Sequence, residues 1–292
     1  TYPATLSEVG IYARLAERAP IARAVPYEPV WPLWTNGSAK QRLLLLPSGE
    51  RIDNRVRPWA FPVGTVFFKT FTYDEGDGGR AVETRLMRRV EDGWDYAAYR
   101  WRDDARDADR VELRGPPTPV AVQPGGDAFE HLVPNLLECR RCHESNETEV
   151  LGFSALQLGA ALEALTARDL FTAPLPQPPT IEAADPETRA VMGYFEGNCN
   201  HCHNGGDGPA SQFSLRPDVL VENTVNVRTT GTSSVDGLRI VPGDPEASVL
   251  YRMMTRRDAE AQPMPPIGVQ RADEAAIDDV RAWIAGLPED LD

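Results

Sequence analysis

The sequence predicts an α+β protein in which a β-rich N-terminal domain, either a sandwich or a barrel, precedes mainly α-helical segments. Between residues 27 and 125, short runs of β-branched and aromatic residues alternate with turn sequences, as in antiparallel sheets. Proline and glycine cluster at 115–126, and residues that open helices recur beyond residue 180. We therefore divide the chain into residues 1–126, 127–180 and 181–292.

The N-terminal part is expected to begin with a helix over residues 4–18, with Ser7 as its N-cap. The run RLLLLPSGERI (42–52) predicts a strand, a turn and a second strand, and GTVFFKTFTYD (64–74) predicts a further strand. Asp92-Gly93 predicts a hairpin turn. The acidic run YDEGDGG (73–79) lacks EF-hand spacing and is expected to be an ordinary loop. Five of the six tryptophans fall in this part and are expected in its core: Trp31, Trp34, Trp59, Trp94 and Trp101.

The C-terminal part is expected to be mostly helical. The run SALQLGAALEALTARDL (154–170) predicts one helix, and TAPLPQPPT (172–180) predicts a proline-rich linker. Asp185 with Pro186, Asp244 with Pro245, and Asp273 are each expected to open a helix.

Charge and hydropathy narrow the class of function. The net charge is −14, and acidic residues alternate with the arginines throughout. Nucleic-acid binding requires a cationic face, so we exclude it. No apolar run approaches the roughly 18 residues of a membrane-spanning helix, so we expect no membrane span.

The four cysteines form two copies of one motif, CRRCH (139–143) and CNHCH (199–203). The shared pattern C-x-x-C-H is the attachment signature of c-type haem. Two thiols at this spacing can form thioethers with the two vinyl groups, and the following histidine then reaches the iron. The sequence thus predicts two covalent haem c groups held by Cys139, Cys142, Cys199 and Cys202, with iron bound by His143 and His203. Arg141 stands where the second copy has His201, which is therefore interpreted as a spacer.

Two other kinds of cysteine site fit the sequence less well than haem does. A four-cysteine zinc site would have the spacing C-x2-C-x56-C-x2-C, which is far longer than zinc ribbons use and leaves both histidines unexplained. A thioredoxin-like motif requires a βαβ context, which neither pair has.

The sequence predicts a second axial ligand for one of the two haems and leaves several candidates open for the other. Met264 lies in AQPMPPIG, a proline-flanked loop that cannot be helical, and it is the expected thioether ligand of the second haem. Met253 and Met254 lie in a predicted helix and are expected in the core. For the first haem, Met87, Met192, His131, water or a vacant position remain open. The ordinary alternative is that both methionines are core residues and that His131 is partly exposed.

These motifs carry a resemblance. The C-terminal 110 residues resemble a class I cytochrome c, with an aromatic-bearing helix before CNHCH, the MPP loop and the closing helix EAAIDDVRAWIAGL. The resemblance implies that Tyr194 or Phe195 packs against Trp283. The whole chain resembles a family of bacterial two-haem c-type cytochromes with a β-rich N-terminal region, through PLWTNGSAKQRLLLLPSGERI, FPVGTVFFKTF, VETRLM, CRRCH, NCNHCH and VPGDPEASVLYRMM.

The expected function is electron transfer by a diheme c-type cytochrome in the periplasm or outside the cell. The chain as given starts without a leader, so export is inferred from covalent haem attachment, which takes place outside the cytoplasm. The alternative is a peroxidase-type oxidoreductase that reacts at the first haem and is fed by the second. A third hypothesis is a binding module whose β-rich domain docks a partner. The expected partner is a redox protein with a cationic patch.

Overall fold

The computed structural model describes residues 2–75, 79–145, 148–175, 177–206, 213–230, 235–256 and 262–289. The chain forms two compact units, which are described separately. The first comprises Thr1–Glu28, Gly37–Arg140 and Leu158–Pro178, and the second comprises Pro29–Asn36, Arg141–Gln157 and Pro179–Asp292. The chain thus departs from its predicted division, because residues 29–36 belong with the C-terminal part and residues 158–178 with the N-terminal part. Part of the predicted acidic loop, residues 76–78, lies outside the described residues.

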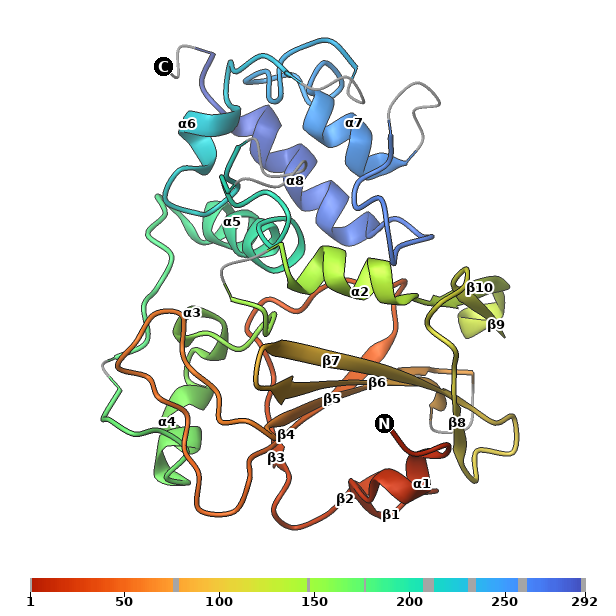
Figure 1. The fold of residues 1–292 in the computed structure, drawn as a ribbon. Helices are drawn as coiled ribbons and strands as arrows, with labels where there is room; N and C mark the ends of the chain where they lie inside the picture. Colours follow the sequence, from red (N-terminus) through yellow and green to blue (C-terminus); the bar gives the residue numbers. More distant parts are fainter. Residues whose placement is uncertain are drawn as a thin grey trace. The chain divides into compact units, whose positions relative to one another are not determined.

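The first unit is built on one six-stranded antiparallel sheet whose strands follow one another in chain order. This sheet is open, because its end strands do not pair with each other, and the two other sheets have only two strands each. The predicted barrel or sandwich is therefore wrong. The strands of the large sheet are β3 (Val25–Pro26), β4 (Ala39–Leu45), β5 (Val66–Tyr73), β6 (Arg80–Val90), β7 (Gly93–Trp101) and β8 (Ala108–Arg110), and β9 (Thr118–Val122) pairs with β10 (Phe129–Val133) (Figure 1).

Both faces of the large sheet are buried, which explains the continuous apolar runs of its strands. On one face Phe68 packs with Leu43 and Leu86. On the other, Phe71 packs with Val82 and with Val120 from β9. Side chains alternate between faces along a strand, so β5 contributes to both layers. The hairpin predicted at Asp92-Gly93 is confirmed, since Val90 pairs with Gly93 where β6 turns into β7.

Two predictions for the first unit are wrong. The helix expected over 4–18 is only α1 (Leu6–Val9), because Gly10 adopts a left-handed conformation with φ 72° that ends it. The chain then forms β1 (Tyr12–Arg14), which pairs with β2 (Ala19–Pro20). Ser7 lies inside α1, and the cap is Thr5, whose backbone N–H donates to Glu8 at 3.1 Å.

The second of the strands expected in 42–52 is likewise missing, because only isolated bridges follow the turn. Among the five tryptophans, Trp59, Trp94 and Trp101 are buried in the first unit as expected. Trp31 and Trp34 belong to the second unit instead.

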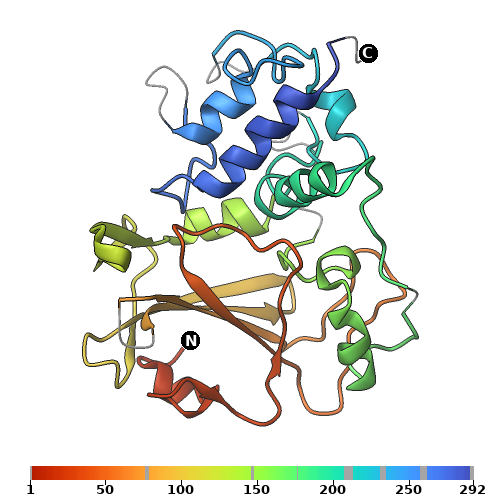
Figure 2. The ribbon, with the colours of Figure 1, turned by 180° about the vertical axis from the view of Figure 1, so that it is seen from behind.

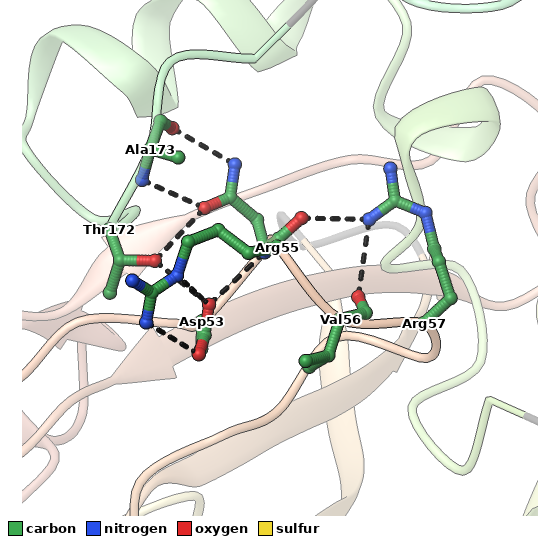
Figure 3. Close-up of polar contacts among 7 residues, drawn as sticks. Asp53, Arg55, Val56, Arg57, Thr172 and Ala173 are labelled. Atoms are coloured by element: carbon green, nitrogen blue, oxygen red, sulfur yellow. Dashed lines mark hydrogen bonds and ion pairs between the residues drawn. The ribbon is translucent and has the colours of Figure 1, made fainter.

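Residues 158–178 are held to the loop after β4 by paired polar contacts (Figure 3). The side chain of Asn54 donates to the carbonyl of Ala173 and accepts from its N–H, each at 2.9 Å. Thr172 donates to Asp53 at 3.1 Å, and hydrogen bonds from Arg55 hold the pKa of the Asp53 carboxyl well below its usual range. The helix predicted over 154–170 is split by Gly159 (φ 48°) into α3 (Ala155–Leu158) and α4 (Ala161–Ala167).

The second unit contains α5 (Pro186–Asn198), α6 (Leu220–Thr224), α7 (Val249–Thr255) and α8 (Glu274–Gly286). Helix α8 packs against both α5 and α7 (Figures 1 and 2). The predicted caps Asp185 and Asp273 are confirmed, since Asp185 accepts from the N–H of Thr188 at 2.7 Å and Asp273 from the N–H of Ala276 at 3.4 Å.

The prediction of a mainly α-helical, cytochrome c-like C-terminal part is wrong. The structure is sheet-rich, and only 24% of the residues that it describes are helical. Asp244 and Pro245 form a turn, and α7 begins only at Val249 after Ser248. Local cap signals therefore locate α5 and α8 correctly, but they say nothing about the irregular chain between the helices. In the part of the chain that the structure describes, every helix is too short or too polar to span a bilayer.

Candidate haem-attachment site

The first C-x-x-C-H motif lies in α2 (Leu136–His143), which an N-terminal cap fixes. Asn135 Oδ1 accepts from the N–H of Glu138 at 3.0 Å, and the Glu138 carboxylate accepts from the N–H of Asn135 at 3.1 Å. At the other end, His143 Nδ1 lies 2.7 Å from the carbonyl oxygen of Glu149. A carbonyl only accepts, so Nδ1 carries the proton and Nε2 is left as the metal-binding nitrogen.

The second motif begins where α5 ends. Cys199 is the C-cap of α5, and its carbonyl accepts from the N–H groups of Cys202 and His203 at 3.1 and 2.9 Å. This tight turn gathers both thiols and the histidine at the end of one helix. The His203 ring lies 4.7 Å from the Phe213 ring, and the His203 carbonyl accepts from the N–H of Leu215 at 2.8 Å.

The structure brings the end of the first motif next to the second motif, within the second unit. Asn204, directly after His203, donates from Nδ2 to the carbonyl of Ser145, two residues after His143, at 2.7 Å. The Cys142 and Cys202 thiols also lie close enough to interact electrostatically, because Cys142 contributes to the raised pKa of Cys202. Within the second unit, the last residues of the first motif and the end of the second motif are therefore neighbours in space.

The thiols of the second motif are not poised for redox chemistry. Burial, with a smaller contribution from Cys202, raises the pKa of Cys199 to about 12. Burial and Cys142 raise the pKa of Cys202 to about 11. A thiol–disulfide oxidoreductase requires the opposite shift, so these groups do not fit that class. Within the described ranges, no three His, Cys, Asp or Glu side chains gather where they could hold a metal ion. A haem iron takes only one or two protein ligands, so it does not require such a group.

Residues 29–36 form a part of the site that the sequence analysis missed. Trp31 crosses α5 at Gly193 and Gly197, where a Cβ atom would overlap the Trp31 indole and carbonyl respectively. These glycines are four residues apart and so lie on one face of α5. The signal was visible in the sequence as two glycines inside a predicted helix, directly before the second motif.

Residues 29–36 also form hydrogen bonds with the C-terminal end of α5 and with the residues that precede α8. The Trp34 N–H donates to Asn198 Oδ1 at 2.6 Å, and Asn198 is the residue before Cys199. The Trp34 indole donates to the carbonyl of Arg271 at 2.9 Å. Asn36 Oδ1 accepts from the N–H groups of Gln270 and Arg271 at 2.7 and 2.9 Å, shortly before α8.

The methionines occupy the positions expected for the second unit. Met253 and Met254 are buried in the core, as predicted. Met264 is half-buried, packs with Val249 and Met253, and donates its N–H to the carbonyl of Met253 at 3.0 Å. Its role as iron ligand stays a prediction. The packing implied for Trp283 is confirmed, with its ring centroid 6.4 Å from that of Phe195.

The candidates for the first haem's distal side are all buried. Met87 and Met192 are core residues, as the ordinary alternative predicted. The expectation that His131 is partly exposed is wrong, since it is 1% exposed. Its Nδ1 lies 3.0 Å from Tyr73 Oη and its Nε2 lies 2.8 Å from the Glu83 carboxylate, so both ring nitrogens are engaged in the core of the first unit.

Comparison of the chain with protein-family models, with known proteins and with solved structures gives no match. The chemistry of the residues themselves therefore indicates the function.

The residues present fit a pair of c-type haems. Each motif offers two half-buried thiols and a histidine in one turn of chain. His143 has the tautomer that leaves Nε2 for iron. The second motif also adjoins a buried cation, Arg239, whose guanidinium lies 3.9 Å from the centroid of the Phe213 ring. An apolar macrocycle with anionic substituents matches this combination of thiols, imidazole and positive charge.

Proposed function

We propose that the protein is a two-haem c-type cytochrome that transfers electrons outside the cytoplasm. The observation that carries the proposal is the junction between Asn204 and Ser145, which ties the two attachment motifs together. Two redox groups attached to neighbouring segments can exchange electrons with each other, whereas widely separated groups would act alone.

The chain's own residues would hold and orient the two groups. Cys139 and Cys142 would bind the first group by thioethers, and Cys199 and Cys202 the second. His143 and His203 would each bind an iron through a ring nitrogen, and the Glu149 carbonyl keeps the His143 ring in the required tautomer. When bound, each haem supplies an iron that changes between ferrous and ferric states. We propose that the Met264 thioether would also bind the iron of the haem held by His203.

Electron transfer is favoured over peroxidase chemistry by the surroundings of the first motif. Peroxide cleavage requires an acid–base group on the open side of the iron. Glu138 directly precedes Cys139. Its carboxylate accepts a hydrogen bond from the backbone N–H of Asn135 and caps α2 instead. The net charge of −14 favours a partner protein with a cationic patch.

The first test is covalent stoichiometry. Protein denatured in acid should retain two haems by mass and give a c-type pyridine haemochrome spectrum. Replacing Cys139 and Cys142 with Ser should remove one haem, and replacing Cys199 and Cys202 should remove the other. Purified protein that contains zinc and shows no Soret band would overturn the proposal.

The second test concerns Met264 and the choice between carrier and enzyme. Met264→Ala should abolish the thioether-to-iron charge-transfer band of the ferric protein and lower one reduction potential, because Met raises the potential of a c haem. Met253→Ala, the matched control, should keep the band. Rapid and saturable peroxide turnover with an electron donor would favour the peroxidase alternative and contradict the carrier assignment.

A further inference from the structure

We propose that Arg239 is a carboxylate-binding residue that receives a propionate of the haem attached at Cys199 and Cys202. This inference depends on the proposed function and adds a binding site to it. It starts from the guanidinium, which is buried beside the second motif.

Arg239 is 9% exposed and makes few polar contacts for so buried a group. Its Nη1 donates to the carbonyl of Asn223 at 2.7 Å. Its guanidinium carbon lies 3.9 Å from the centroid of the Phe213 ring, a cation–π contact. A guanidinium has five N–H donors and stays charged in proteins, so these contacts leave most of its donors available.

A buried charge is normally matched by an opposite charge, because removing an ion from water is costly. Among the residues that the structure describes, no carboxylate forms an ion pair with Arg239. Burial accordingly lowers the pKa of Arg239, with no acidic group to offset it. Arg228, eleven residues earlier, differs on both counts, since it is exposed and paired with Asp236 at 2.9 Å. The buried arginine thus presents an unmatched positive charge within the second unit.

The position of this charge identifies its ligand. The Phe213 ring that contacts the guanidinium also lies 4.7 Å from the ring of His203. Arg239 is therefore one aromatic ring away from the expected iron ligand. The porphyrin ring is apolar apart from its two propionates, which are carboxylates of the kind that a guanidinium binds in a bidentate fashion. A free carboxylate in solution has the same chemistry and is the competing source.

The experiment compares the reduction potentials of both haems in the wild type and in Arg239→Gln, Arg239→Lys and Arg228→Gln. A positive charge near iron favours the ferrous state. Removing a unit charge about 10 Å away at an effective dielectric constant of 20 should shift the ferrous-to-ferric equilibrium roughly tenfold, or about 59 mV for one electron. We expect Arg239→Gln to lower one potential by this amount and Arg239→Lys to restore most of it. Arg228→Gln, with the same charge change on the surface, should leave both potentials in place.

Each outcome decides between the two sources. If both haems are present and Arg239→Gln leaves their potentials unchanged, the inference is wrong while the proposed function stands. If added acetate shifts the wild-type potential but not that of Arg239→Gln, the site takes free carboxylates and the propionate assignment fails. A protein without haem would contradict both proposals. If Arg239→Gln does not fold, Phe213→Leu still tests the site, because it should alter one potential and spare the other.

Discussion

Each of the two units buries a charged side chain, and the two are compensated differently. In the first unit, Glu83 is fully buried and is bonded to Arg85 at 2.6 and 2.9 Å and to His131 at 2.8 Å. In the second unit, Arg239 is nearly as buried, and its guanidinium donates to the Asn223 carbonyl and lies over the Phe213 ring. The chain supplies the counter-charges of Glu83 itself, whereas it supplies none for Arg239 among the described residues.

The polar cluster around Glu83 is complete within the folded chain, whereas we propose that Arg239 requires a bound ligand for its counter-charge. The Glu83 network extends through His131 to Tyr73 and joins β5, β6 and β10, so its role is completed by folding. Arg239 lies beside the motif to which the sequence assigns a cofactor. A buried charge with full partners is thus explained by the fold, while one without them points to chemistry that the chain does not contain.

The largest expected effect is on Glu83. Glu83→Ala leaves Arg85 and His131 facing an empty space, and breaking a buried ion pair costs about 3–5 kcal/mol of unfolding free energy. Urea denaturation followed by tryptophan fluorescence measures it. The matched control is Asp95→Ala, which removes the half-exposed pair with Arg88 and should cost less than about 1 kcal/mol. Equal losses in the two variants would show that the buried network is not special.

The same carboxylate makes the stability of the first unit depend on acid. Burial alone would raise the pKa of Glu83, but Arg85 and His131 together lower it to about 2. A lowered pKa in the folded state stabilises the protein above the unfolded value, near 4.3, and this contribution is lost as the pH falls towards 2. Unfolding free energies of wild type and Glu83→Gln should therefore converge between pH 4.5 and 2, because Gln does not titrate. Parallel curves over this range would contradict the assignment.

Local signals predicted parts of both units for clear physical reasons. The Asp92-Gly93 turn, the caps at Asp185 and Asp273, and the C-x-x-C-H motifs depend on residues adjacent in sequence. The helix expected over 4–18 failed because Ile11, 1% exposed, is a core residue of the sheet layer rather than part of a helical stripe. Gly10 ended the helix locally, and contacts between residues far apart in sequence placed Ile11 in the core.

The site shows the same limit. The sequence identified both motifs but could not show that Asn204 bonds to Ser145, fifty-nine residues away. Nor could it place Trp31 on Gly193 or pair His131 with Glu83, since each contact joins segments that only the fold brings together. Arg239 was missed because one arginine among many carries no local signal, and its burial alone makes it informative.

The next effect tests whether residues 29–36 hold the second unit together. Gly193→Ala places a methyl group into the Trp31 indole, and overpacking of this kind costs about 1–3 kcal/mol. Gly286→Ala, at the end of α8, adds the same methyl group where nothing lies within 4 Å, and it should be neutral or slightly stabilising. Thermal unfolding of both variants measures the difference. If Gly193→Ala is as stable as Gly286→Ala, Trp31 does not pack closely against α5.

The smallest expected effect concerns the hydrogen bond between Asn204 and Ser145, which joins the segments that follow the two motifs. Asn204 makes two hydrogen bonds, since Nδ2 donates to the Ser145 carbonyl at 2.7 Å and Oδ1 accepts from the N–H of Gly206 at 3.0 Å. Asn204→Ala removes both, and because the site is partly exposed, the loss should be about 0.5–1.5 kcal/mol.

Asn204→Asp separates the two bonds and so serves as the matched variant. An aspartate keeps the acceptor for Gly206 but turns a carboxylate oxygen towards the Ser145 carbonyl, which repels it. If the bond between the loops matters, Asn204→Asp is at least as destabilised as Asn204→Ala, as measured by denaturant unfolding at neutral pH. A stability close to wild type would mean that the local turn, not the junction, accounts for the effect. The proximity of the two motifs would then have to depend on packing elsewhere in the second unit rather than on this hydrogen bond.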